Sequence, residues 1–192
     1  GSGGNAGSGG NAGSGGNAGS GGSAGGGPTA CSSNAGCAAH EYCAKADCAD
    51  QTVGVCTAKP TDCTNVVADP VCGCDGVTYH DACLLHLNRQ NGLAVQPAGG
   101  VCSKAAAGTL TCTALDSGAC TAKNGVCSNK DDSCPGPLPI SAPGVCWVIP
   151  ETCPSADPKP VVSCGALNTC RSECAVLKSK VRYASSPSCS SG

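Results

Sequence analysis

The sequence is poor in the large side chains that fill ordinary protein cores. Its 192 residues include no Phe, no Met, one Trp and three Tyr. Aromatic side chains supply much of the buried area of a typical domain, so this chain cannot build a large hydrophobic core. It also contains no apolar run long enough to span a membrane. Apolar burial alone is therefore not expected to hold the fold together.

Charge and catalytic motifs are equally sparse. The formal net charge is −2, and no large basic face is evident, which argues against nucleic acid as a partner. No set of Ser, His and Asp or of Cys and His has the spacing of a catalytic site, so we expect a protein that is not an enzyme and uses no cofactor. There is no C-x2-C pair, and the Asp131-Asp132 pair is typical of a solvated loop. We therefore expect no metal site.

Cysteine is what the chain has in abundance. The 20 Cys among 192 residues lie in the range that signals a disulfide scaffold. Such scaffolds form in oxidising compartments, so we expect a secreted or cell-surface protein. Its start at Gly1, without Met, is what we expect of a processed product. Each bridge typically adds about 2–4 kcal/mol of stability, which compensates for the small core.

The cysteines fall into two blocks of ten, which predicts two modules. Gly54-Val55-Cys56 in the first block matches Gly144-Val145-Cys146 in the second, and both continue as C-x3-P-x2-C. We expect a first module over 31–102, a linker over 103–111 and a second, degenerate copy over 112–192. A tail over 1–30 precedes them. The even count predicts five bridges within each block.

Regular structure is expected to be sparse, which makes the fold class small, disulfide-rich α+β. Asp81 is a good N-cap for a helix over 82–90, with Gly92 as its stop, and a strand over 93–95 follows. In the second module we expect a helix over 173–180 and a strand over 181–183. Each module would then consist of one short helix and a small antiparallel sheet.

The N-terminal tail repeats with a period of six residues, GSGGNA. In an extended helix with three residues per turn, each column of the triplet lies on its own face. The bare glycine face would allow close approach to another backbone. We expect the tail to dock on neighbouring copies, although its composition also fits a flexible linker. The glycines that begin each triplet are Gly1, Gly4, Gly7, Gly10, Gly13, Gly16, Gly19, Gly22 and Gly25.

Residues 56–102 resemble a Kazal domain. The resemblance rests on the stretch from Pro70 to Cys83, PVCGCDGVTYHDAC, which is similar to the family pattern P-V-C-G-x-D-G-x-T-Y-x-N-x-C. Asp81 stands where Asn is usual, and the family's cysteine early in the following helix is missing. The four cysteines from 31 to 48 resemble the hairpin that precedes the Kazal part in follistatin-like modules. The resemblance implies the pairs Cys63–Cys83 and Cys72–Cys102, with Cys56–Cys74 as the pair that remains.

The second block resembles the first only through its cysteine order and flanking residues. It lacks the D-G-x-T-Y stretch, and its segment between 164 and 174 is one residue shorter. Equivalence of position implies the pairs Cys153–Cys174, Cys164–Cys189 and Cys146–Cys170.

Two functions follow from these patterns. The triplet tail favours a structural subunit of a secreted filament or surface assembly that binds copies of itself. The Kazal resemblance implies the alternative, a serine protease inhibitor whose loop over 64–71 enters the active site, with Asn65 or Val66 as the specificity residue. Neither this loop nor its counterpart over 154–163 has Lys or Arg at that place, which favours an elastase- or subtilisin-like target over trypsin. An adhesive or binding module is a further alternative.

Overall fold

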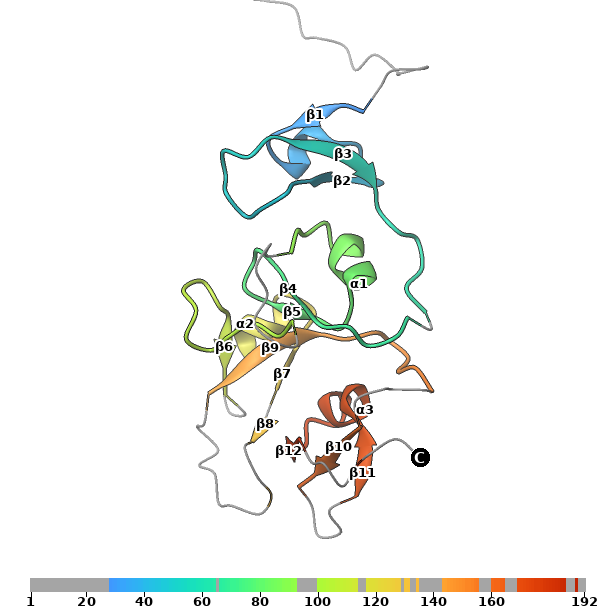
Figure 1. Cartoon of the computed structure of the whole chain (residues 1–192), viewed down its shortest axis with the longest axis vertical. Helices are drawn as coiled ribbons and strands as arrows, with labels where there is room; N and C mark the ends of the chain where they lie inside the picture. The colour runs from blue at the N-terminus through green and yellow to red at the C-terminus, as the bar shows by residue number, and fades with distance from the viewer. Residues whose placement is uncertain are drawn as a thin grey trace, which may run out of the picture.

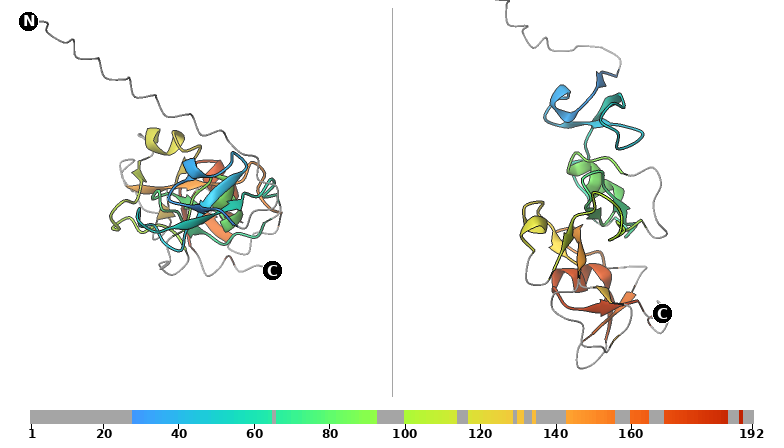
Figure 2. Two further views of the ribbon diagram at one scale, coloured as in Figure 1. Left: turned by 90° about the horizontal axis from the view of Figure 1, so that it is seen from above. Right: turned by 90° about the vertical axis from the view of Figure 1, so that its left-hand side faces the viewer.

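The computed structural model describes residues 28–64, 66–92, 100–113, 117–128, 130–131, 134, 143–155, 160–164, 169–185 and 189. Over these residues the chain forms three small sheets with short helices between them, stacked along one long axis (Figure 1). The N-terminal sheet lies at one end of this axis, and the last strands of the chain lie at the other (Figures 1 and 2). The predicted tail, 1–30, lies outside the described residues up to position 27.

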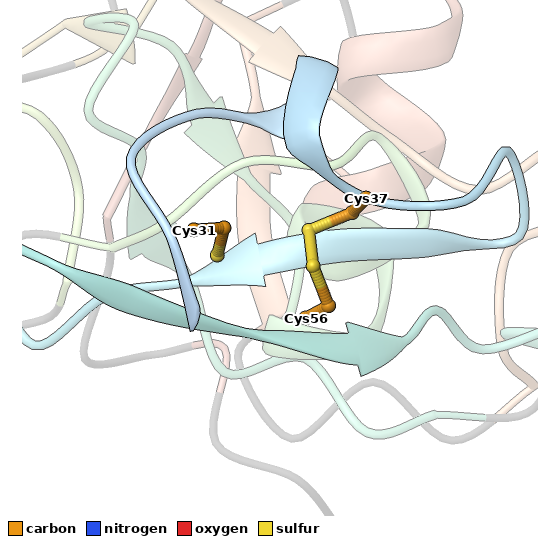
Figure 3. Close-up of side chains that lie close together, drawn as sticks. All are labelled: Cys31, Cys37 and Cys56. Atoms are coloured by element: carbon orange, nitrogen blue, oxygen red, sulfur yellow. A yellow bond between two sulfur atoms is a disulfide. The ribbon is translucent and has the colours of Figure 1, made fainter. Parts of the chain in front are cut away.

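The N-terminal sheet is a small unit stapled by two disulfides. Its strands are β1 (Ala30–Cys31), β2 (Glu41–Ala44) and β3 (Gly54–Ala58), in the order β1-β3-β2 with antiparallel pairing. A 3-10 turn, η1 (Asn34–Gly36), lies between β1 and β2. One bridge joins Cys31 to Cys43, and another joins Cys37, just after η1, to Cys56 on β3 (Figure 3).

The next unit contains a hairpin and a helix. Strands β4 (Val71–Cys72) and β5 (Thr78–Tyr79) pair in antiparallel fashion, and α1 (Ala82–Leu87) follows. The predicted cap is confirmed, because the Asp81 carboxylate accepts a hydrogen bond from the backbone N–H of Leu84. The helix ends earlier than predicted because the chain turns into a left-handed conformation at Arg89, with φ of 58°. The strand predicted over 93–95 lies outside the described residues.

The central sheet combines strands from both cysteine blocks. The second block supplies β6 (Thr111–Cys112), β7 (Val126–Cys127) and β9 (Gly144–Val148), with helix α2 (Gly118–Thr121) after β6. Strand β9 pairs in antiparallel fashion with β6 and β7, and in parallel fashion with β5. The sheet therefore runs across the predicted linker at 103–111, whose last residue begins β6.

The C-terminal sheet has the order β11-β10-β12-β8. Its strands are β8 (Lys130–Asp131), β10 (Pro160–Ser163), β11 (Cys170–Ser172) and β12 (Tyr183–Ala184). Helix α3 (Glu173–Lys178) is two residues shorter than the predicted helix and is capped by the Ser172 side chain, which accepts from the N–H of Ala175. The strand predicted over 181–183 is present as β12, shifted toward the C-terminus.

Two hydrophobic clusters lie along the axis. The first is shared by the two cysteine blocks, with buried members Cys63, Val77, Tyr79, Leu84, Leu85, Cys112, Cys120, Cys127, Cys146 and Val148. The second surrounds Trp147 between β9 and α3 and includes Val176 and Tyr183. Half of the first cluster consists of cysteines, so disulfide sulfur takes the place of the missing aromatic volume. No helix among the described residues combines the length and the apolar character needed to cross a bilayer.

All ten disulfides lie within one block or the other, five in each, as the even counts predict. Cys63–Cys83 and Cys72–Cys102 form as the resemblance implies. The expected pair Cys56–Cys74 is wrong, because Cys56 lies on β3, where it is bridged to Cys37. Cys74 is bridged to Cys48 instead, which ties the N-terminal sheet to the β4-β5 hairpin.

In the second block one expected pair forms and two are wrong. Cys153 is bonded to Cys174 as expected. The expected pairs Cys164–Cys189 and Cys146–Cys170 do not form. Cys146 lies on β9 and is bridged to Cys120 at the start of that unit, while Cys164 is bridged to Cys134 and Cys170 to Cys189.

The register of the hairpins explains the exchange. Cys170 on β11 lies opposite Val162, just as Thr78 on β5 lies opposite Cys72. The last cysteine of the first block, Cys102, is bonded to Cys72 on the first strand of its hairpin, β4. The last cysteine of the second block, Cys189, is bonded to Cys170 at the same cross-strand position, but on the second strand of its hairpin, β11.

Candidate functional site

The segment between β3 and β4 contains an exposed loop with both ends anchored. At its start, Cys63 is 7% exposed and is bonded to Cys83 on α1. At its end, Ala68 and Pro70 are buried, and the N–H of Asp69 donates to the carbonyl oxygen of His80 at 3.1 Å. The loop is therefore clamped to the helix on one side and to the end of β5 on the other.

The entrance of the loop is shaped by a carboxylate. Asp62 accepts two hydrogen bonds from Thr64, one from its backbone N–H at 2.8 Å and one from its hydroxyl at 2.9 Å. These bonds, the backbone one first, lower the pKa of Asp62 below its ordinary value of 3.8. This Asx-type turn restricts the residue that leads into the loop and so reduces the conformations that the loop can adopt.

Two adjacent valines in the loop have different environments. Val66 is half-buried and packs against the cluster shared by the two blocks. Val67 is 59% exposed and is one of the few large apolar side chains on the surface. The predicted specificity residue Asn65 lies outside the described residues. Val67 was missed at the sequence level because adjacent valines give no signal of which one packs inward.

His80 and Asp81 form a buried pair behind the loop. Their side chains are joined at 2.9 Å between Nδ1 and the carboxylate, and both residues are 2% exposed. The other carboxylate oxygen of Asp81 accepts from the N–H of Leu84 at 2.9 Å. The Asp81 carboxylate also lies within 4.8 Å of the sulfurs of Cys63 and Cys83. These contacts hold the start of α1 and the anchor of the loop together, which is a structural role.

The corresponding segment of the second block is built differently. Its last four residues, Pro160–Ser163, form strand β10, and Val161 and Val162 are buried. Residues 156–159 lie outside the described residues. Only the start of the predicted second loop, Pro154 and Ser155, is described outside regular structure. In Figure 1 the chain leaves β9 on the same side of the molecule on which the first loop projects.

Three groups of metal-ligating residue types occur in the described part of the chain. Each consists mainly of cysteines, for example Cys31, Cys37 and Cys56 near η1 (Figure 3). Every one of these sulfurs is in a disulfide. A bridged sulfur is not a thiolate, which is the form that binds metal. The groups are therefore crossings of disulfides and do not offer ligand sets.

The comparison with protein families bears directly on the anchored loop. Residues 58–104, which contain the loop, the β4-β5 hairpin and α1, match the model of the Kazal-type serine protease inhibitor domain. This segment is a Kazal-like domain. The match includes both of the disulfides that the resemblance implied. No curated protein and no solved structure matches the chain.

The Kazal-like domain lies between two disulfide units that contact it at different places. The N-terminal sheet contacts α1, where the ring of Tyr42 stacks on that of His86 with 4.7 Å between centroids. The side chain of Asn91 accepts from the N–H of Lys45 and donates to the carbonyl oxygen of Cys43. On the other side, β9 pairs with β5. Together these contacts brace the domain that carries the loop.

Proposed function

We propose that the chain is a secreted inhibitor of a serine protease and that the loop over 64–69 enters the protease active site. The observation that carries the proposal is an exposed apolar residue, Val67, on a loop anchored at both ends within a Kazal-like domain. A loop that is held in one conformation before binding loses little entropy when it binds. A substrate-like loop fixed in this way is how Kazal inhibitors act.

The residues of the loop favour a protease with an apolar or small pocket. Residues 64–71 contain no Lys or Arg, so a trypsin-like pocket finds no charge partner. The choice between Asn65 and Val66 as the specificity residue stays open. Val66 packs against the core and fits a supporting position better, whereas Val67 supplies exposed apolar contact. We therefore propose an elastase- or subtilisin-like target.

Inhibition assays with the full chain test this proposal. Residual activity would be measured for elastase-, subtilisin- and trypsin-type proteases, with strong inhibition expected for one of the first two. Val67→Asp is expected to weaken inhibition about 10-fold or more, as for a central contact residue. Val53→Asp is the matched control, since Val53 is 70% exposed but lies in the N-terminal unit.

Limited proteolysis would locate the reactive bond. A slowly hydrolysed bond after Asn65 or after Val66, identified by mass spectrometry, would assign the specificity residue. No inhibition of any of the three proteases, or equal inhibition by Val67→Asp and the parent chain, would contradict the proposal.

The alternative is the structural subunit that assembles through its tail. It rests on the triplet repeat over residues 1–27, which lie outside the described part of the chain. No feature of the described Kazal-like domain supports the structural-subunit function. We keep it as a second candidate because the strict glycine register is unexplained by the inhibitor function.

A further inference from the structure

The N-terminal sheet and the first strands of the second block share one strand frame. In the first, Cys31 lies opposite Gly54 and Cys43 opposite Cys56. In the second, Cys112 lies opposite Gly144 and Cys127 opposite Cys146. The bridges also correspond, Cys31–Cys43 to Cys112–Cys127 and Cys37–Cys56 to Cys120–Cys146. In each sheet the residue before the first strand accepts an equivalent hydrogen bond: the N–H of Cys56 donates to the carbonyl of Thr29, and that of Cys146 to the carbonyl of Leu110. Strand β3 is therefore the counterpart of β9.

The counterpart strands differ in what covers one edge. Beyond β6, the edge of β9 receives β5, with Thr78 opposite Trp147 and Tyr79 opposite Val148. The N–H of His80 also donates to the carbonyl of Val148 at 3.0 Å. All five residues of β9 are buried. This contact is a strand addition made by one disulfide unit to the next.

Beyond β1, the same edge of β3 has no further strand on it among the described residues. Beyond β1, the positions that correspond to Trp147 and Val148 are Thr57 and Ala58, and both are exposed. Because backbone groups alternate between the two edges of a strand, the N–H and C=O of Ala58 point to the same edge as those of Cys56, whose N–H donates to the carbonyl of Thr29 just before β1. No partner for them lies in the described part of the chain.

The opposite half of the contact is also open at the other end of the molecule. Strand β11 is the counterpart of β5: Arg171 lies opposite Val161 as Tyr79 lies opposite Val71. The strands that follow agree, since Ser163 lies opposite Tyr183 as Gly73 lies opposite Gly92. Where β5 is covered by β9, β11 is the outermost strand of its sheet among the described residues, with Cys170 and Arg171 exposed.

We infer that copies of this chain associate end to end, with the open edge of β11 in one copy adding to the open edge of β3 in the next. The junction would repeat the β5-β9 contact, with Cys170 opposite Thr57 and Arg171 opposite Ala58. Strands β3 and β11 lie toward opposite ends of the long axis (Figure 1). Such a head-to-tail contact does not close on itself in a dimer and extends into a chain of copies.

Charge complementarity supports this occupant. On β2, Glu41 lies opposite Ala58, so in the junction Arg171 and Glu41 of the next copy would lie on one row with only the small Ala58 between them. Long side chains on one face of a sheet reach such diagonal and next-strand neighbours. In the internal junction the positions of Arg171 and Ala58 hold the apolar pair Tyr79 and Val148. The end-to-end contact is thus more polar, which suits a surface that must stay soluble in the single copy.

Sedimentation velocity of the full chain over a concentration series tests the inference. The parent chain is expected to form elongated oligomers that grow with concentration. Ala58→Pro removes an N–H that has no partner in the described part of the single copy, and a proline is tolerated at such an edge position; it is expected to keep the chain monomeric. Arg171→Glu and Glu41→Arg are each expected to weaken association about 10-fold or more, because they place like charges together. The double variant Arg171→Glu/Glu41→Arg is expected to restore it.

Lys104→Glu is the matched control, since it makes the same charge change at an exposed residue between the two blocks and is expected to associate like the parent chain. A complete set of disulfides by mass would show that each variant is folded. A parent chain that stays monomeric up to about 1 mM, the weak end of measurable affinity, would overturn the inference. So would association that Ala58→Pro and Arg171→Glu both leave unchanged, or a double variant that is no better than its parents.

Discussion

The backbone N–H of His80 donates to the carbonyl oxygen of Val148 at 3.0 Å, so the end of the Kazal-like hairpin is hydrogen-bonded to a strand of the second block. Val148 is 5% exposed and belongs to the cluster shared by both blocks. The two blocks therefore depend on one another for part of their core.

This dependence predicts one cooperative unfolding transition. Val148→Ala is expected to lower the free energy of unfolding by about 2 kcal/mol, since a buried valine loses most of its side chain. Val53→Ala, at an exposed position, is expected to change it by less than about 0.5 kcal/mol. Hydrogen exchange at increasing denaturant concentration would measure the free energy of unfolding of both variants. Two separate transitions, with only one shifted by Val148→Ala, would contradict shared folding.

The Gly-Val-Cys motif predicts a second effect on stability. A Cβ at Gly144 would lie 1.9 Å from the carbonyl oxygen of Ser128 and 3.0 Å from the sulfur of Cys127. Gly144→Ala is therefore expected to destabilise the chain by about 1–3 kcal/mol, the usual cost of overpacking. Gly36→Ala is the control, because its nearest neighbour would be the Cβ of Cys31 at 3.8 Å. Thermal unfolding would compare the two variants. Equal melting temperatures would contradict the prediction, because they would show that β9 and the segment at Ser128 can move apart without loss of stability.

The three tyrosines predict how stability changes at alkaline pH. Burial raises the pKa of Tyr42, and burial followed by the nearby Asp75 carboxylate raises that of Tyr79. Burial and then Glu173 raise the pKa of Tyr183. The folded state thus holds these protons more tightly than the unfolded state, whose tyrosines titrate near 10. The stabilising effect is complete below pH 10 and is lost as the pH rises above it.

Ultraviolet difference absorbance would follow tyrosinate formation in the folded chain. Little signal is expected near pH 10, and the bulk of it is expected together with unfolding at higher pH. A full three-tyrosine signal with a midpoint of 10 in the folded protein would contradict the buried environments.

The glycine register of the tail predicts a contrast between two sets of substitutions. Val at Gly10, Gly13 and Gly16 would block close backbone approach, whereas Val at Ser8, Ser14 and Ser20 leaves the glycine column intact. If the tail docks on other copies, only the first set abolishes that association. Light scattering would measure it in the Ala58→Pro background, which removes the contribution of the strand edges. Equal behaviour of the two sets would identify the tail as a linker.

The sequence predicted the parts of this fold that depend on local patterns. The Pro70-to-Cys83 stretch located the Kazal-like hairpin, and Asp81 marked the start of α1 because an N-cap is a local interaction. The paired Gly-Val-Cys motifs marked two strands that prove to have the same register. The sequence located the residues of the loop, but the inward packing of Val66 depends on a cluster whose members come from both cysteine blocks.

What could not be predicted was decided by contacts between distant segments. The predicted pair Cys56–Cys74 joins the two cysteines that the Kazal resemblance leaves over, whereas in the structure Cys56 on β3 is bridged to Cys37 at the end of η1. The parallel addition of β9 to β5 joins residues far apart in the chain, and no local pattern signals it. The only sign of this pairing in the sequence is that β9, Gly144–Val148, is apolar throughout, which is typical of a strand covered on both faces.

The distribution of the disulfides also sets how the molecule would respond to a pulling force. The bridges overlap in an unbroken series from Cys31 to Cys102 and again from Cys112 to Cys189, and none joins the two series. Between them only residues 103–111 are free of covalent cross-links. Tension along the axis would therefore shear the β5-β9 hydrogen bonds and release a segment of roughly 30 Å at about 3.4 Å per residue. The overlapping disulfides on either side would limit further extension. The molecule would therefore consist of two inextensible segments joined by one short segment that extends under force and can re-form its hydrogen bonds when the force is removed.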